Sequence, residues 1–276
     1  FAIYGLSEYY RASGNERSLQ LAQELFWTLE KNNLDKEYGG YIEALSEDWS
    51  PLDDMRLSVK DANEPKSMNT HLHILEPYTN LYRCWKNPIL AESIRKLIRI
   101  FLDKIIDSKT AHFNLFFDID WTVKSSIVSY GHDIEGSWLL AEAAEELGDE
   151  KLIEEVNQMA VRMVNVTRDE GSDNDGSIFY ESEGKHFDTD KHWWPQAEAM
   201  VGYVNAWKIT GDKKYLNLAE KVWDFIDLHI IDHGLGEWFW RVDIDGIPYT
   251  TDDKIGFWKC PYHNTRALIE VIKRIK

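Results

Sequence analysis

Two residues of the stretch GHDIEGSW, residues 131–138, have the chemistry for proton transfer. His132 and Glu135 are three residues apart at the start of an apolar run of helical period, so both side chains are expected on one face of a first helical turn. A neutral imidazole accepts and returns protons near neutral pH, and a carboxylate can hold its tautomer. The stretch therefore predicts an acid–base site where this helix begins.

The same arrangement of a polar pair at the start of an apolar helix returns three more times. The further pairs are Asn69 with His73, Trp194 with Glu198, and His263 with Arg266. Between His73, His132, Glu198 and His263 the intervals are 59, 66 and 65 residues. Such a period indicates a repeat architecture.

His132 and His263 are the predicted proton-transfer pair, because two imidazoles on opposite sides of a substrate can act as base and acid in turn. The alternative is that each is a buried structural histidine, but recurrence at one place in the repeat favours catalysis. Asn69 and His73 are four residues apart and share a helix face, whereas His71 points elsewhere and is expected to pack or lie at the surface. No H-E-x-x-H or EF-hand pattern occurs, so no metal site is predicted.

Tryptophans near these pairs predict a sugar-binding site. The run HWWPQAE contains Trp193, Trp194 and Glu198, and Trp258 comes shortly before His263. An indole face packs on the apolar face of a pyranose, while a carboxylate accepts hydrogen bonds from sugar hydroxyls. A tryptophan pair buried in the core is the alternative.

Glu135, Glu198 and Asp133 also admit a glycosidase, in which two carboxylates flank the glycosidic bond. No G-x-S-x-G elbow, P-loop or G-x-G-x-x-G is present, which excludes serine hydrolases, kinases and dinucleotide-binding enzymes of those patterns.

The charge balance limits the partners. The 276 residues include 48 acidic and 31 basic ones, for a net charge of -17, whereas nucleic acids and anionic membranes are bound by clustered Lys and Arg. Cys84 and Cys260 form no C-x-x-C pair, so neither a disulfide framework nor a cysteine metal site is expected. No apolar run is long enough to span a membrane, and no signal peptide opens the chain. We expect a cytoplasmic protein without nucleic-acid or membrane partners.

Hydrophobic periodicity predicts nine helices, joined in pairs by short turns. The predicted ranges are 2–13, 16–33, 67–85, 89–106, 131–147, 150–168, 194–210, 213–230 and 262–275. Long loops with β character separate the pairs, and the Gly-Gly in EYGGYIEAL predicts a hairpin. The first helix of a pair is more continuously apolar and is expected inside, whereas the second is amphipathic and is expected outside.

Such an array forms an open solenoid or a closed toroid. In a closed ring the N-terminal ends of the inner helices converge, so the four polar motifs would line one pocket. A toroid of six pairs has twelve helices. The nine predicted helices and the missing initial Met therefore lead us to expect that an N-terminal segment is absent.

The chain resembles the N-acylglucosamine 2-epimerase superfamily, and within it the cellobiose 2-epimerases. The resemblance rests on the segments FAIYGLSEYY, NTHLHILEPYTNLYR, GHDIEGSWLL, WWPQAEAMVGY and WKCPYHNTR, which run from end to end of the chain. It implies an all-α (α/α)6 barrel, here one truncated catalytic domain over residues 1–276. It also implies cofactor-free epimerisation at C2 of the reducing-end glucose of β-1,4-linked disaccharides, and a cytoplasmic location.

Residue by residue, His132 and His263 resemble the two acid/base histidines of the family, and Glu135 the acidic neighbour of the first. His73 resembles the histidine of ring opening and closing, and Asn69 a substrate-binding asparagine. The other matching positions are Trp193, Trp194 and Glu198 in the sugar platform and Tyr4 in the pocket lining. The essential arginine of the family belongs to first helices that this chain lacks.

The implied mechanism removes the C2 proton next to the C1 aldehyde and returns a proton to the opposite face through an enediol(ate). The expected substrate is a disaccharide such as cellobiose, lactose or mannobiose, and the expected assembly is a monomer or weak dimer. Alternatives are an N-acylglucosamine 2-epimerase or aldose–ketose isomerase acting on a monosaccharide, an inverting glycoside hydrolase on a similar toroid, and a non-catalytic interaction protein.

Overall fold

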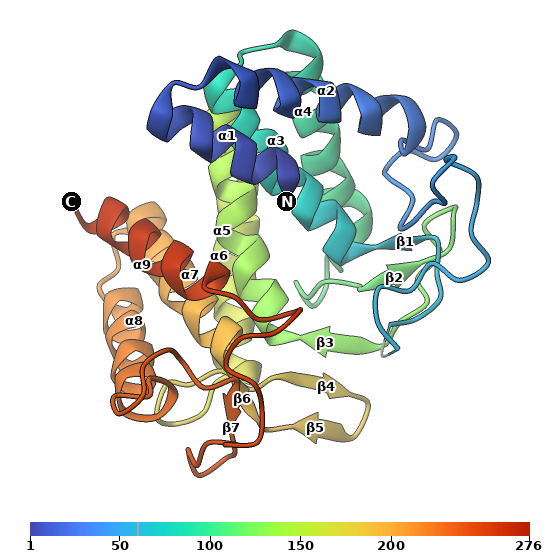
Figure 1. The fold of residues 1–276 in the computed structure, drawn as a ribbon. Helices are drawn as coiled ribbons and strands as arrows, with labels where there is room; N and C mark the ends of the chain where they lie inside the picture. The colour runs from blue at the N-terminus through green and yellow to red at the C-terminus, as the bar shows by residue number, and fades with distance from the viewer. Residues whose placement is uncertain (60) are drawn as a thin grey trace. The chain divides into compact units, whose positions relative to one another are not determined.

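The computed structural model describes residues 1–59 and 61–276, which are mostly helical (Figure 1). The α-helices of this part are α1 (Ala2–Ser13), α2 (Glu16–Asn32), α3 (Met68–Cys84), α4 (Pro88–Ile100), α5 (Tyr130–Leu147), α6 (Glu150–Gly171), α7 (Trp193–Thr210), α8 (Lys214–Phe225) and α9 (Tyr262–Ile275). The strands are β1 (Lys66–Ser67), β2 (Phe116–Phe117), β3 (Ile127–Ser129), β4 (Glu181–Glu183), β5 (His186–Asp188), β6 (Lys191–His192) and β7 (Arg241–Val242). The nine predicted helices are confirmed in these described residues, with small differences at their ends.

The largest of these differences lie at the ends of α4 and α8. Both α-helices end early and continue as π-helical turns, η1 (Phe101–Ile105) and η2 (Ile226–Ile230). The amide of the next residue, Ile106 or Ile231, donates to the carbonyl five residues earlier. Periodicity alone does not distinguish this wider turn from an α-helical one.

Capping residues explain where several helices begin and end. The side chains of Asn15, Ser67 and Asn87 accept backbone N–H groups in the first turns of α2, α3 and α4. Gly14 and Gly211 end α1 and α7 in the left-handed conformation, with φ of 69° and 71°, which glycine adopts without steric cost.

The described chain divides into two compact units. Unit 1 consists of Phe1–Ser108, Phe113–Ser126 and Leu139–Val156, and unit 2 of Lys109–His112, Ile127–Trp138 and Asn157–Lys276. The helix α5 thus gives its first half to unit 2 and its second half to unit 1.

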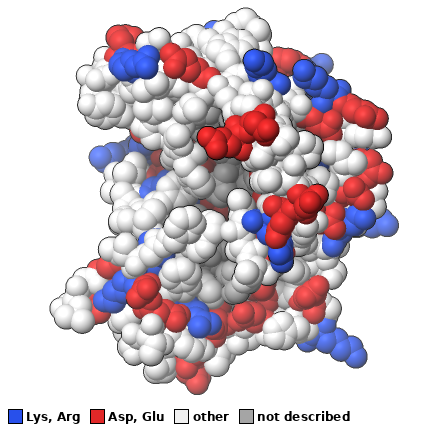
Figure 2. Space-filling view, turned by 45° about the vertical axis from the view of Figure 1, so that its right-hand side comes forward, with Lys and Arg blue, Asp and Glu red and all other residues white. Residues whose placement is uncertain are grey.

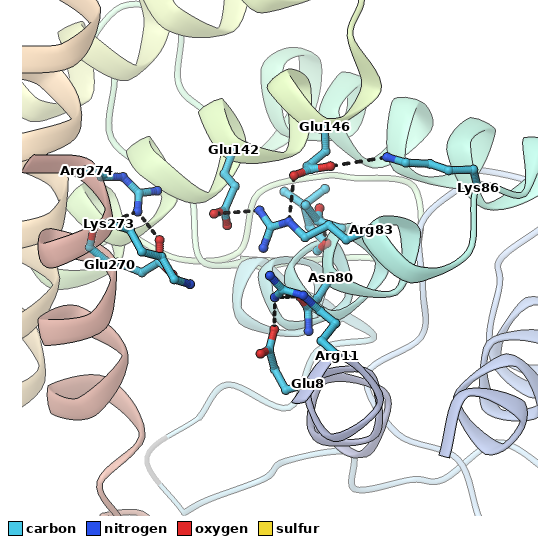
Figure 3. A network of polar contacts seen from close by, with 12 residues as sticks. Glu8, Arg11, Asn80, Arg83, Lys86, Glu142, Glu146, Glu270, Lys273 and Arg274 are labelled. Carbon is cyan, nitrogen blue, oxygen red and sulfur yellow. Dashed lines mark hydrogen bonds and ion pairs between the residues drawn. The ribbon is translucent and has the colours of Figure 1, made fainter. Parts of the chain in front are cut away.

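In unit 1, α3 packs against α1 and α4 and supplies much of the core. Leu72, Leu75 and Tyr78 of α3 are completely buried. At the other end of α3, the Arg83 guanidinium donates to carboxylates of α5, Glu142 and Glu146, each at 2.8 Å (Figure 3). These ion pairs tie α3 to the second half of α5.

In unit 2, α7 packs against α8 and α9. An unbroken run of α7, residues 193–206, is buried, whereas α8 buries only four residues on one face. The prediction that the first helix of a pair is the more buried one is confirmed here. Figure 3 also shows side chains of α9, where Lys273 and Arg274 pair with Glu270.

The strands before three of the paired helices each pair with a strand of the following loop. β1 pairs with β2, β3 with β4, and β6 with β7, all antiparallel, and β5 extends β4. The hairpin predicted in EYGGYIEAL was wrong in detail. Its glycines lie in a turn closed by one isolated bridge between Leu34 and Tyr41, and the pairing does not continue into two strands.

Three buried lysines hold these loops. Lys66, Lys191 and Lys259 are completely buried just before α3, α7 and α9. The Nζ of Lys66 donates to Asp35 and to the carbonyls of Gly39 and Ile119, at 2.6 to 2.8 Å. The other two make similar bonds: Lys191 to Asp173, Asp175 and Ile244, and Lys259 to Glu237 and Lys254. In each case the buried ammonium donates hydrogen bonds to a carboxylate of a loop and to at least one backbone carbonyl, which compensates for its burial.

The exposed charges are mixed in sign. Figure 2 shows Lys and Arg interspersed with Asp and Glu over the face in view. Among the helices of the described residues, none is both long and apolar enough to cross a membrane.

Candidate active site

The first turns of α5, α7 and α9 bring three of the four predicted motifs together within unit 2. His132 is the third residue of α5, Trp194 the second of α7 and His263 the second of α9. The ring centroids of His132 and Trp194 are 4.6 Å apart, and those of Trp194 and His263 are 5.6 Å apart. Both imidazoles therefore contact the same indole.

His263 is oriented by a buried carboxylate. Its Nδ1 lies 2.7 Å from Oε1 of Glu198, which is completely buried. Oε1 also accepts from Nη2 of Arg266 at 2.7 Å, and Oε2 accepts from Nε1 of Trp138 at 3.0 Å. Because a carboxylate only accepts, Nδ1 of His263 carries the hydrogen in this contact.

Glu198 stays ionised in this setting. Burial alone would raise the pKa of its carboxyl, but the charge of Arg266 and the hydrogen bond and charge of His263 together hold the pKa below its usual value. We predicted that Glu198 accepts sugar hydroxyls. Its three protein donors and complete burial instead favour the orientation of His263.

Glu135 shares the same guanidinium. Its Oε1 accepts from Nη2 of Arg266 at 2.6 Å and lies 3.9 Å from Nδ1 of His263. Arg266 also stacks over the rings of Trp138 and Tyr262. Glu135 and Glu198 therefore share one guanidinium beside His263.

Glu135, Glu198 and His263 are also a conceivable metal site, since their ligand atoms lie within 4.8 Å of one another. Nη2 of Arg266, however, is within hydrogen-bond distance of both carboxylates. The guanidinium thus supplies the positive charge that a metal ion would otherwise bring to these oxygens.

His132 has a different partner. Its Nδ1 lies 2.7 Å from Oγ of Ser129, three residues earlier. We expected Glu135 to hold this imidazole, and this carboxylate accepts a hydrogen bond from Arg266. An interval of three residues puts two side chains on one helix face but does not decide which longer-range partner each one takes.

The two other tryptophans predicted to bind sugar, Trp193 and Trp258, differ in exposure. Trp193 is 4% exposed and packs against Trp240 with ring centroids 4.9 Å apart. Trp258 is 56% exposed and contacts Phe257 edge to face. Of the two, only Trp258 offers an open face in this structure.

The remaining predicted residues belong to unit 1. The ring of His73 lies 4.9 Å from that of Phe1, and its Nδ1 is 3.6 Å from Oε2 of Glu76. Asn69, at the start of α3, and Tyr4 of α1 are half-buried.

His71 is a packing residue, one of the two places we expected for it. It is completely buried, its Nδ1 donates to the carbonyl of Ser67 at 2.6 Å, and its Nε2 accepts the Tyr41 amide at 2.9 Å. Burial lowers the pKa of His71 to about 4, so the ring is neutral.

Sequence reasoning missed three supporting residues, Ser129, Trp138 and His112. Ser129 could have been found, because its interval of three residues to His132 places the two side chains on one side of a helical turn. Trp138 lies within GHDIEGSW, but its partner Glu198 is 60 residues away. His112 is an isolated loop histidine, and nothing in the local sequence distinguishes it.

Comparison with known proteins gives one family over nearly the whole chain. The family described as N-acylglucosamine 2-epimerase (GlcNAc 2-epimerase) matches residues 1–267. A cellobiose 2-epimerase of Bacteroides fragilis is 51% identical over 274 residues, which are 99% of this chain and 70% of the relative. A cellobiose 2-epimerase of Ruminococcus albus is 40% identical over 275 residues, 99% of this chain and 70% of that protein.

A solved structure supports the fold. The cellobiose 2-epimerase of Bacillus thermoamylovorans superposes with a TM-score of 0.94 at 38% identity, covering 99% of this chain and 70% of that chain. The predicted fold class, an all-α (α/α)6 barrel, is confirmed by this likeness.

Proposed function

The chain belongs to the N-acylglucosamine 2-epimerase family, and we propose that it epimerises C2 of the reducing-end glucose of β-1,4-linked disaccharides such as cellobiose. Membership of the family makes it a carbohydrate epimerase or isomerase. The disaccharide is proposed because similar chains are named cellobiose 2-epimerase. The observation that carries the mechanism is the contact of His132 and His263 with one indole, that of Trp194.

The reaction needs two proton carriers. Once the sugar ring is open, the C2 proton is acidic because it is next to the C1 aldehyde. A base removes this proton, and the electron pair of the C2–H bond moves towards the carbonyl to give an enediolate. An acid on the other face then gives a proton to C2, the carbonyl re-forms and glucose has become mannose.

The two imidazoles are suited to opposite roles. Glu198 and Glu135 favour the cation at His263, so His263 is the acid in the direction from glucose to mannose. Its Nε2 carries the proton to be delivered. His132 has a neutral hydroxyl partner and is the base. In the reverse direction the roles exchange.

The other predicted residues bind and open the sugar. We assign ring opening to His73, binding of sugar hydroxyls to Asn69, and lining of the pocket to Tyr4. Trp194 is the stacking surface between the two proton carriers, and the open face of Trp258 is a second surface for a sugar ring.

The geometry counts against an inverting glycoside hydrolase that uses Glu135 and Glu198. Their closest ligand oxygens lie within 4.8 Å of each other, whereas inverting enzymes separate the two carboxyl groups by about 6.5–9.5 Å to admit a water. Both also bind Arg266, which favours their ionised forms over the protonated form that a general acid needs.

Incubation with a panel of sugars in D2O, followed by NMR, tests this function. Cellobiose is expected to give glucosyl-mannose with deuterium at C2. If deuterium exchange and epimerisation occur only with mannose or N-acetylglucosamine, the proposed substrate is wrong but the proposed proton transfer stands. Release of free glucose from cellobiose would contradict epimerisation.

A further inference from the structure

In three of the motif-bearing helices, α3, α5 and α7, the side chain of the fourth residue holds a loop in place. At the fourth position of α3 and of α7, His71 and Gln196 bond to loop backbone. His71 accepts the amide of Tyr41, and the Gln196 amide accepts from and donates to Ile178. Both of these ties are made by neutral side chains.

In α5 the fourth residue is Asp133, and it binds a loop through an ionisable side chain, that of His112. Oδ2 of Asp133 lies 2.6 Å from Nδ1 of His112, while Nε2 of His112 lies 3.2 Å from Oε2 of Glu170 on α6. Asp133 is completely buried and His112 is 6% exposed. Since both ring nitrogens face carboxylate oxygens, both contacts are hydrogen bonds only when the ring is doubly protonated.

The surroundings support that charged form. Burial alone would lower the pKa of His112, but Asp133 and then Glu170 raise it, and the pKa lies above its ordinary value. The other titratable group facing the ring is Tyr130 of α5, with ring centroids 6.1 Å apart. The pKa of Tyr130 is itself raised, mainly by burial.

We propose that His112 is a positioning residue for His132, because it clamps Asp133, the next residue on the same helical turn, to Glu170 of α6. The clamp fixes the first turn of α5 and thereby the direction in which the His132 imidazole points. Its kinetic consequence rests on the proposed function. Misplacement of a reacting group by about 1 Å can reduce a rate by about 100-fold.

The clamp responds to pH in one direction. Below the raised pKa of His112 the imidazolium holds both carboxylates. Above that pKa one ring nitrogen has only a lone pair facing a carboxylate, so one contact becomes repulsive. We expect kcat to fall on the alkaline side, with KM nearly constant because His112 does not touch the substrate.

Three variants test the clamp. His112→Gln keeps a donor for Asp133 but has no charge and no titration, so kcat is expected to fall about tenfold at neutral pH. The part of the alkaline limb that follows His112 is expected to disappear, while the part that follows the proton donor His263 remains. Glu170→Gln removes one of the two carboxylates that raise the pKa, so the alkaline limb is expected to move to lower pH. His233→Gln, at a largely exposed histidine, is the matched control and keeps the wild-type pH profile.

Histidine NMR provides a readout that does not need turnover. In the wild-type protein the ring signals of His132 are expected to shift with the titration of His112, and this shift disappears in His112→Gln. An unchanged kcat profile in both His112→Gln and Glu170→Gln, or a His132 signal that ignores the His112 titration, would overturn the inference. If His112→Gln does not fold, Glu170→Gln and the wild-type titration decide. Absence of sugar turnover in the wild type with the NMR coupling intact would reject the proposed function alone.

Discussion

His132 and His263 are the same residue type near the start of two helices, yet their surroundings differ in charge. The Nδ1 of His263 donates to a buried carboxylate that is shared with Arg266, whereas Nδ1 of His132 faces the hydroxyl of Ser129. A carboxylate partner favours an imidazolium, whereas a hydroxyl adds no charge that would favour it. This difference is the basis on which we propose that His263 is the acid and His132 the base.

Removal of either imidazole should have the largest effect. We expect His132→Ala and His263→Ala each to lower the rate of epimerisation by about 10³-fold or more, because each removes one of two obligatory proton carriers. His233→Ala, at an exposed histidine, serves as the control. Epimerisation by either active-site variant at near wild-type rate, measured by NMR on folded protein, would break the comparison.

Removal of the charge at the partner of His263 should have the next largest effect. Glu198→Gln keeps the shape but leaves Nδ1 of His263 without a charged acceptor. Since a hydrogen bond to a charged group contributes about 1.5–3 kcal/mol, we expect kcat to fall about 10- to 100-fold. The rate is measured with circular dichroism as the check on folding. A raised KM with kcat intact would mean that Glu198 binds sugar instead.

Removal of the hydroxyl at the partner of His132 should have a smaller effect. Ser129→Ala deletes one neutral hydrogen bond of about 0.5–1.5 kcal/mol, so kcat is expected to fall about two- to tenfold. A loss as large as that of Glu198→Gln would show that the two partners do not differ in kind and would remove the basis for assigning acid and base.

A completely buried histidine of unit 1, His71, provides the limit of the comparison. His71→Gln places at the fourth position of α3 the residue that α7 has there, Gln196, and kcat is expected to change less than about twofold because His71 only ties a loop. A large loss of activity in this folded variant would show that His71 also takes part in the site.

The stability of the wild-type protein should reveal the neutral state of His71. Its folded pKa is about 4, below the ordinary value of about 6.5, so the unfolded chain binds a proton that the folded chain does not. Stability therefore falls by about 3 kcal/mol as pH decreases from about 6.5 to about 4, and is unaffected by this group above that range. Urea unfolding at several pH values should show that this fall in stability between about pH 6.5 and about pH 4 is absent in His71→Gln. An identical pH dependence of stability in both proteins would contradict the neutral state of His71.

Features that depend on residues close in the sequence could be predicted from it, whereas features that depend on distant residues could not. The helix boundaries depend on neighbours a few residues away, and the period of the apolar residues located α1 and α9 at their observed ends. The motif pairs also marked the helix starts that meet in unit 2. The partners of those motifs were harder to predict, because Arg266 and Glu135 are 131 residues apart. A local pattern contains no information about such a pair.

The buried lysines show the same limit. A lysine before a helix is usually a surface residue, and Lys66 became a buried clamp only because Asp35 and two carbonyls, brought close by the fold, satisfy its ammonium. The ionic tie of His112 to Asp133 arises in the same way, across 21 residues.

The most direct test of the central claim is isotope exchange by the two single-histidine variants in D2O. With His132 as the base for the glucose epimer, His263→Ala is expected to exchange the C2 proton of cellobiose without forming product. His132→Ala is expected to exchange the C2 proton of glucosyl-mannose but not that of cellobiose. Exchange of the opposite epimers would reverse the assignment of acid and base. Exchange of neither substrate by either folded variant, while the wild-type enzyme turns over, would contradict the mechanism of two independent imidazoles.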